Sequence, residues 1–186
     1  MGVAAVKGPA VFLDRDGVIN CAIVRGGKPY APETLGELVV PGEVGPALAR
    51  LKAAGFRLVV VTNQPEVARG RLRRETVEAI HAALASTLPL DEFRVCYHDE
   101  GDGCGCRKPQ PGLLLQPPAH DLARSVLVGD RWRDIEAGRR AGVGATVWID
   151  RGYAERSAEP HVRVSSLSEA VEWILDPVRR LGGAAS

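Results

Sequence analysis

Three short stretches of the chain are almost entirely apolar and end abruptly in polar residues. The apolar runs occupy residues 11–13, 58–61 and 126–128, and the residues that follow them are Asp14, Thr62-Asn63 and Gly129-Asp130. Continuous runs of β-branched residues and leucine, without polar alternation, are typical of strands that are buried on both faces. We therefore predict strands of a parallel sheet at these positions and further strands at residues 93–97 and 145–149.

Segments with helical spacing separate the predicted strands. Apolar positions recur three or four residues apart in residues 43–54 and 73–84, and a last helix is expected at residues 166–175. Strands that alternate with helices favour the α/β class, with a Rossmann-like, doubly wound parallel sheet. Ligands of such sheets bind beyond the carboxyl ends of the strands, where the polar residues of this chain lie.

Two segments depart from the alternating pattern. Residues 20–41 form a long connection rich in Gly and Pro, which we expect to be a loop facing the substrate. Pro117 and Pro118 interrupt the helix expected after Pro111, because proline removes a backbone donor and disfavours helix at the residue before it. That helix should therefore be short or broken.

Length and composition indicate an ordinary globular protein. The 186 residues suit a single domain over residues 1–186, with its core at about residues 10–176. Hydrophobic residues make up 45% and charged residues 25%, and 24 basic against 23 acidic residues give a net charge of +1, which indicates no nucleic-acid partner. The first apolar run is too short for a signal peptide and no stretch reaches membrane-spanning length, so we expect a cytoplasmic protein without membrane contact.

Asp14 and Asp16 lie two residues apart just beyond the first predicted strand. Where the backbone is extended, two such carboxylates face the same way and repel each other unless a cation or a shared proton intervenes. Asp130 and Asp134, beyond another strand, complete a set of oxygen ligands suited to Mg²⁺. A metal-bound carboxylate is a competent nucleophile toward phosphorus, so the pattern indicates phosphoryl transfer through an aspartyl-phosphate.

Phosphoryl transfer also needs hydrogen-bond donors and positive charge around the phosphate. Thr62 offers donors at the end of the second strand, and Lys108 offers a point charge. Asp16, when protonated, can deliver a proton to the leaving alcohol and later deprotonate the hydrolytic water.

Four motifs follow in chain order: DRDGVIN, VVVTNQ, RKPQPG and VGDRWRD. They resemble the four motifs of the haloacid dehalogenase (HAD) superfamily of aspartate-nucleophile phosphatases. With the CxH and CxCRKP spacings, the chain looks like the D-glycero-D-manno-heptose 1,7-bisphosphate 7-phosphatase family, to which histidinol-phosphate phosphatases are closely related. The resemblance runs from about residue 11 to residue 152, and no segment between the motifs is large enough for a cap domain. It implies a HAD-like, Mg²⁺-dependent phosphomonoesterase that removes the 7-phosphate of a heptose bisphosphate in the synthesis of lipopolysaccharide or nucleotide-activated heptose precursors.

The resemblance also assigns roles to individual residues. Asp14 would be the nucleophile and Asp16 the acid/base, and Mg²⁺ would be held by Asp14, the main chain of Asp16, and Asp130. Asp134 would orient the metal site or Lys108. The phosphoryl group would be held by Thr62 and Lys108, and the rest of the substrate by Asn20, Asn63, Gln64, Arg107 and Arg131. The family commonly has Ser-Gly after TNQ, where this chain has Pro65-Glu66, so the loop that meets the sugar is expected to differ.

Three of the four cysteines lie within eleven positions, next to a histidine. Cys96, His98, Cys104 and Cys106 supply three thiolates and one imidazole, a ligand set suited to tetrahedral Zn²⁺, with iron as an alternative. A site with four protein ligands has no open position and is structural. We therefore predict a zinc-binding loop at residues 96–106 that holds the following Arg107-Lys108 in place.

Other functions fit parts of the pattern. A histidinol-phosphate phosphatase or an enzyme for nucleic-acid 3′-phosphates would use the same chemistry. A phospho-aspartate receiver switch also combines a strand-end aspartate with Thr and Lys, but Asp16 as a general acid favours hydrolysis over a long-lived phosphoryl group. The expected partner is a small phosphorylated sugar and the expected state is a monomer. The remaining histidines, His81, His120 and His161, are expected to be surface or packing residues.

Overall fold

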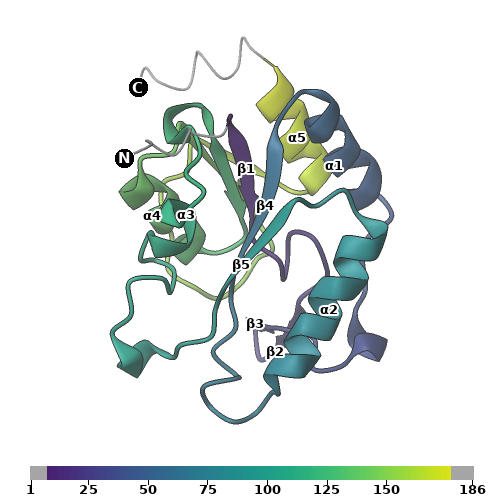
Figure 1. Ribbon diagram of the computed structural model, residues 1–186, viewed down its shortest axis with the longest axis vertical. Coiled ribbons are helices and arrows are strands. Elements are labelled where there is room, and N and C mark those ends of the chain that lie inside the picture. Colours follow the sequence, from purple (N-terminus) through teal and green to yellow (C-terminus); the bar gives the residue numbers. More distant parts are fainter. Residues whose placement is uncertain (1–7, 177–186) are drawn as a thin grey trace.

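A central sheet of six parallel strands, with helices on both faces, dominates the computed structural model, which describes residues 8–176 (Figure 1). The two ends of the predicted domain, residues 1–7 and 177–186, lie outside the described residues. The strands are, in sheet order, β5 (Glu92–Cys96), β4 (Arg57–Asn63), β1 (Ala10–Leu13), β6 (Val126–Gly129), β7 (Ala145–Ile149) and β8 (Val162–Val164). Every neighbouring pair is parallel, so the predicted doubly wound α/β fold is confirmed.

The helices form one layer on each face of the sheet (Figure 1). The layer of α1 (Val44–Ala53), α2 (Arg74–Thr87) and α5 (Leu167–Leu175) packs on one face, and that of α3 (Gly112–Leu115) and α4 (Trp132–Ala141) on the other. Successive strand residues point to opposite faces, so Val11 belongs to the first core cluster and Phe12 to the second. Because both faces are covered, β1 and β6 are buried throughout, which explains their unbroken apolar runs.

The observed elements differ from the predicted ones mainly at short segments. Helices α1 and α5 begin and end within one residue of the prediction, and α2 continues to Thr87. The helix before Pro117 has four residues, which agrees with the prediction that it is short or broken. Strand β8 was not predicted, because three residues with an exposed Arg163 between half-buried valines give no clear pattern. Within residues 8–176, no helix is long and apolar enough to cross a membrane.

The long connection of residues 20–41 contains an antiparallel hairpin, β2 (Ile23–Arg25) and β3 (Lys28–Tyr30), followed by a 3₁₀ turn (Leu35–Glu37). Gly26 and Gly27 form the two-residue turn with φ of 57° and 73°. A turn of this kind needs positive φ at both positions, which glycine adopts without strain. The backbone N–H of Ala154 donates to Gly27 O (3.3 Å), so the tip of the hairpin contacts the segment after β7.

Two further 3₁₀ turns lie in the loops before and after α3. One spans Glu100–Asp102, between β5 and α3, and is closed by a capping box between Asp99 and Asp102. The other spans Leu122–Arg124, just before β6. The first turn belongs to the predicted metal-binding loop and brings Glu100 to the edge of the site described next.

Candidate active site

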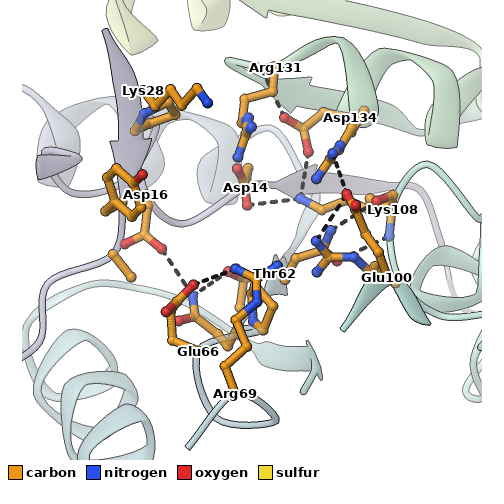
Figure 2. A pocket seen from close by; sticks show the side chains of 18 residues that line it. Asp14, Asp16, Lys28, Thr62, Glu66, Arg69, Glu100, Lys108, Arg131 and Asp134 are labelled. Carbon is orange, nitrogen blue, oxygen red and sulfur yellow. Dashed lines mark hydrogen bonds and ion pairs between the residues drawn. The ribbon is translucent and has the colours of Figure 1, made fainter. Parts of the chain in front are cut away.

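The carboxyl ends of β1, β4 and β6 meet at a cavity of about 310 Å³ (Figure 2). The predicted site residues that line it are Asp14, Asp16, Thr62, Asn63, Gln64, Arg107, Lys108, Arg131 and Asp134. Asn20 and Asp130 are not among its lining residues, although both lie close behind them. The structure thus brings together side chains that are up to 120 positions apart in the sequence, from Asp14 to Asp134.

Lys108 lies at the centre of the site, with only 2% of its surface exposed. Its Nζ donates to Asp14 Oδ1 (2.8 Å), Asp134 Oδ1 (2.5 Å) and the carbonyl oxygen of Val61 (2.7 Å) (Figure 2). Burial disfavours the charged amine, but the carboxylates of Asp134 and Asp14 outweigh it and raise the pKa of Lys108 above its usual value. The lysine is therefore a fixed positive charge next to Asp14.

Three buried carboxylates gather around this lysine. Oxygens of Asp14, Asp130 and Asp134 lie within 4.8 Å of one another. Burial and the charge of Asp134 raise the pKa of Asp14 to about 6, against the opposing effect of Lys108. Burial and the charges of Asp14 and Asp134 raise the pKa of Asp130 well above its usual value. Such a set repels itself unless a cation joins it, which fits a divalent metal ion with oxygen ligands.

Asp130 itself supports this interpretation. It is 1% exposed, and a hydrogen bond from the hydroxyl of Tyr153 lowers its pKa less than burial and the charges of Asp14 and Asp134 raise it. A buried carboxylate that one hydroxyl compensates only in part is costly, so its oxygens are suited to coordinate a cation. Gly17 makes room for it, because a Cβ there would lie 1.8 Å from Asp130 Oδ2 and the φ of Gly17 is +93°.

Asp16 has a different environment from Asp14. Its Oδ1 accepts from Arg15 Nε (3.1 Å) and Asn20 Nδ2 (3.0 Å), and its Oδ2 accepts from Arg15 Nη2 and Gln64 Nε2, both at 3.0 Å. Burial opposes ionisation, but Arg15 and the two amides outweigh it and lower the pKa of Asp16. The resting side chain is therefore an ionised acceptor, whereas the predicted general acid must carry a proton.

The end of β4 links the motifs to one another. Gln64 Nε2 donates to Thr62 Oγ1 (2.9 Å) as well as to Asp16, so this amide bridges two predicted catalytic residues. Asn63 exchanges two hydrogen bonds with the main chain of Lys108: its Nδ2 donates to Lys108 O and its Oδ1 accepts from Lys108 N, both at 3.0 Å. Asn63 and Gln64 thus position other site residues, in addition to the substrate contacts expected of them.

Ion pairs surround the outer part of the cavity. Arg131 is held by both carboxylate oxygens of Glu155, and its backbone N–H donates to Asp134 Oδ2 (3.1 Å) at the start of α4. Arg107 donates to His98 O (3.3 Å) and lies 3.7 Å from Glu100. Sequence reasoning did not assign further lining residues to the site, namely Lys28, Tyr30, Glu66, Arg69, Glu100 and Arg133. The signals for some of them were the expectations that residues 20–41 face the substrate and that the loop at Pro65-Glu66 meets the sugar.

The predicted metal-binding loop closes on itself beside the cavity. The Sγ atoms of Cys96, Cys104 and Cys106 and the Nδ1 atom of His98 form five close pairs, with separations of 3.2 to 3.7 Å. Cys106 Sγ lies 3.3 Å from His98 Nδ1, and Cys96 Sγ lies 3.7 Å from Cys104 Sγ. These separations suit four ligands around one ion at the Zn–S and Zn–N distances of about 2.3 and 2.0 Å. The donor set therefore fits zinc, and its last member, Cys106, is two residues from Lys108.

Comparisons with known proteins agree with this geometry. Residues 105–174 match the HAD-hydrolase-like family model. A D-glycero-beta-D-manno-heptose-1,7-bisphosphate 7-phosphatase of Mesorhizobium japonicum is 36% identical over 94% of this chain and 84% of its own length. The enzyme of that name from Escherichia coli K12 is 34% identical over 93% of this chain and 91% of its own. The D,D-heptose 1,7-bisphosphate phosphatase of B. bronchiseptica, solved with magnesium and phosphate, is 31% identical, covers 90% of this chain and 98% of its own, and gives a TM-score of 0.76.

The parallel sheet, with an aspartate after β1 and a buried lysine beside it, defines a HAD-like hydrolase, as the sequence motifs indicated. Within that class, the chain belongs to the D-glycero-beta-D-manno-heptose-1,7-bisphosphate 7-phosphatase family. The predicted resemblance is thereby confirmed.

Proposed function

We propose that this protein is a Mg²⁺-dependent phosphomonoesterase that removes the 7-phosphate of D-glycero-D-manno-heptose 1,7-bisphosphate through an aspartyl-phosphate on Asp14. The observation that carries the proposal is the contact of Lys108 Nζ with Asp14 Oδ1, at the shared carboxyl edge of the strands. The substrate follows from the names of relatives that match this chain over nearly its full length. A cytoplasmic location, a monomeric state and the lack of a nucleic-acid partner remain predictions.

The reaction proceeds in two displacements at phosphorus. In the first, a carboxylate oxygen of Asp14 bonds to phosphorus, the bond from phosphorus to the sugar oxygen breaks, and that oxygen takes a proton from Asp16. In the second, Asp16 takes a proton from water, the water oxygen bonds to phosphorus, and Asp14 is released with inorganic phosphate. Thr62 and Lys108 bind the oxygens of the transferring group throughout.

Asp16 must change its hydrogen bonds during this cycle. As a carboxylate with four donors around it, it is ready to act as the base of the second displacement. For the first displacement it must gain a proton and turn toward the leaving oxygen, which requires that some of these donors release it. Substrate entry near Gln64, which lines the cavity, gives one of them a new partner.

Three groups are the proposed Mg²⁺ ligands. They are the carboxylates of Asp14 and Asp130 and the main-chain carbonyl of Asp16. Bound Mg²⁺ supplies neutralisation of negative charge on the phosphoryl group and on Asp14. Asp134 is already bound by Lys108 and by the backbone N–H of Arg131. Its proposed role is therefore to orient Lys108.

The cluster of Cys96, His98, Cys104 and Cys106 is the proposed structural zinc site. All four donors come from the protein, and the same ligand set also suits iron. The ion would fix the loop that carries Arg107 and Lys108. Arg107 and Arg131, which both line the cavity (Figure 2 labels Arg131), are the proposed contacts of the remote phosphate, since a guanidinium binds phosphate with two parallel hydrogen bonds.

Asp14→Asn tests the central step, because an amide oxygen is a poor nucleophile. We expect turnover to fall by roughly a thousandfold or more, in line with losses measured for other enzyme nucleophiles. The measurement is phosphate release from heptose 1,7-bisphosphate with Mg²⁺, compared with Asp121→Asn, which makes the same chemical change outside the cavity. Retention of activity in Asp14→Asn would exclude a covalent role for Asp14.

A comparison of three substrates tests the assignment of the sugar. The wild-type protein should prefer heptose 1,7-bisphosphate to histidinol phosphate and to fructose 1,6-bisphosphate in kcat/KM. Equal rates on all three would indicate a generalist phosphatase, and a preference for histidinol phosphate would assign the chain to the related activity.

A further inference from the structure

Arg15 lies directly behind the proposed acid/base and has no exposed surface. Its Nε and Nη2 bind both oxygens of Asp16, at 3.1 and 3.0 Å. Its remaining terminal nitrogen, Nη1, lies 3.0 Å from Nε2 of His81, which is 66 positions further along the chain. A guanidinium whose three nitrogens all meet fixed partners is held in one plane, so the orientation of Asp16 depends on what holds Arg15.

Of the two residues that bind the Arg15 guanidinium, Asp16 belongs to the same motif as Arg15, whereas His81 lies far along the chain. It is a buried residue of α2, and its ring stacks on Phe93 of β5 with centroids 4.8 Å apart and an angle of 27° between the planes. Guanidinium nitrogens only donate, so Nε2 of His81 must be the acceptor and the ring proton must be on Nδ1. Burial and the charge of Arg15 lower the pKa of His81 to about 4, which agrees with a neutral ring that accepts.

Phe93 and Glu78 complete the surroundings of the imidazole. The stacked ring of Phe93 fixes its plane, and Glu78 Oε2 lies 3.9 Å from Nδ1, on the side of the ring that carries the proton. The sequence predicted only a surface or packing role for His81. The structure instead shows a buried polar contact that leads from α2 through Arg15 to Asp16.

We propose that His81 is a positioning residue for the phosphatase reaction, which acts by holding Arg15 and thereby orienting the Asp16 carboxylate. The proposal rests on the proposed function, because it concerns the acid/base of that reaction. Without the acceptor, a buried N–H of Arg15 loses its partner, and the fork that holds Asp16 is free to shift. Proton transfer depends on the placement of Asp16, whereas substrate binding depends on other residues, so the effect belongs to kcat.

Two substitutions of His81 separate the hydrogen bond from packing. His81→Phe keeps a flat ring against Phe93 but removes the acceptor, and we expect kcat to fall roughly tenfold with KM nearly unchanged. His81→Gln offers Oε1 as a new acceptor for Arg15 and should recover most of the lost kcat. Leu84→Ala, a fully buried apolar position on the same helix, is the control for loss of stability alone. All are assayed well below the melting temperature of the least stable variant.

The outcomes separate this proposal from the function on which it rests. A fall in kcat for His81→Phe, with recovery in His81→Gln and an unchanged kcat in Leu84→Ala, supports it. Unchanged kcat in His81→Phe, a change confined to KM, or an equal loss in Leu84→Ala would overturn it. If the wild-type protein releases no phosphate from heptose 1,7-bisphosphate, histidinol phosphate or fructose 1,6-bisphosphate, the proposed function itself is wrong.

Discussion

The cations around the cavity differ in whether a carboxylate already binds them. Six basic side chains line it, namely Lys28, Arg69, Arg107, Lys108, Arg131 and Arg133. All but Lys28 have a carboxylate partner within 4 Å. In the described part of the chain, Lys28 has no such partner. It is exposed on β3, and Figure 2 shows it at the rim of the cavity, on the same side as Arg131. A phosphate can bind Lys28 without displacing an acidic group, whereas Arg131 must first release Glu155.

Lys28→Gln should therefore weaken binding of the remote phosphate. We expect KM for heptose 1,7-bisphosphate to rise roughly fivefold to tenfold, a typical effect of one exposed charge-assisted contact, with kcat little changed. KM for a heptose 7-phosphate, which lacks the remote phosphate, should change much less. Increasing salt should reduce the difference between wild type and variant.

Arg25→Gln is the matched control for this substitution. Arg25 lies on the same hairpin, carries the same charge, pairs with Glu33 and does not line the cavity. Lys28 does not bind the remote phosphate if Lys28→Gln raises KM equally for heptose 1,7-bisphosphate and heptose 7-phosphate. The same conclusion follows if Arg25→Gln raises KM as much as Lys28→Gln does.

The order of the motifs was enough to predict which residues lie together at the carboxyl edge of the sheet, because that placement depends on the fold class; their roles stay predictions. Asp14, Thr62 and Asp130 end buried parallel strands, and the carboxyl ends of neighbouring strands lie at one edge of the sheet. The contacts of His81 and Lys28 depend on which helix face or hairpin side packs near that edge. Those are tertiary details that no local pattern of one sequence contains, so their roles required the structure.

At the scale of elements, the loop between β5 and α3 joins the metal cluster to the cavity. It begins at Cys96, the last residue of β5, and its far end is closed by a hydrogen bond from Gly112 N to Gly105 O (2.9 Å). Arg107 and Lys108 lie between Gly105 and Gly112, the two residues that this hydrogen bond joins. An ion at the cluster would therefore add to the ion pairs of Asp99 with Arg69 and of Glu100 with Arg133 in ordering a segment that has few apolar side chains.

Removal of the loop metal should lower activity without abolishing it. We expect roughly a tenfold loss of kcat/KM after chelation and return of Mg²⁺ alone, because Arg107 loses its fixed position while Asn63 still binds the main chain of Lys108. Metal analysis of the purified protein and activity before and after zinc is restored provide the measurement. Full turnover of the chelated protein with Mg²⁺ would exclude a role for the cluster in catalysis.

Element prediction succeeded for the long buried runs and for most longer elements, and failed for segments of three residues with mixed exposure. Strands β1, β4 and β6 carry unbroken apolar runs because helices cover both of their faces. Strand β8 and the β2–β3 hairpin have three residues per strand and mixed exposure. Segments of that length contain too few positions for an alternation to be recognised, and pairing partners rather than local sequence determine them.

At the scale of the whole molecule, the site concentrates negative charge inside a nearly neutral protein. The carboxylates of Asp14, Asp130 and Asp134 are buried, and Lys108 is the cation that contacts two of them. Uncompensated buried charge opposes folding, so the function of the site is in conflict with the stability of the metal-free protein. A divalent cation that binds only the folded state relieves this conflict.

Asp130→Asn should make the metal-free protein more stable and less responsive to Mg²⁺. We expect a gain of about 1 kcal/mol at pH 8, or roughly 2–4 °C in melting temperature for a chain of this length, because one buried negative charge is removed. Melting curves in chelator and in Mg²⁺ test both parts. A wild-type melting temperature that does not respond to Mg²⁺, or an equal response in Asp130→Asn, would contradict the assignment of Asp130 as a ligand.

The side chain of Asn63 binds the main chain of Lys108 as a neighbouring β-strand would. Its side-chain amide donates to the carbonyl oxygen of Lys108 and accepts from the backbone N–H of Lys108. In a β-ladder, a neighbouring strand makes the same pair of hydrogen bonds with its backbone. The lysine is thus fixed to the end of β4 independently of the path by which the chain reaches it. The length of the segment between His98 and Cys104, five residues in this chain, therefore does not by itself determine where the amine lies.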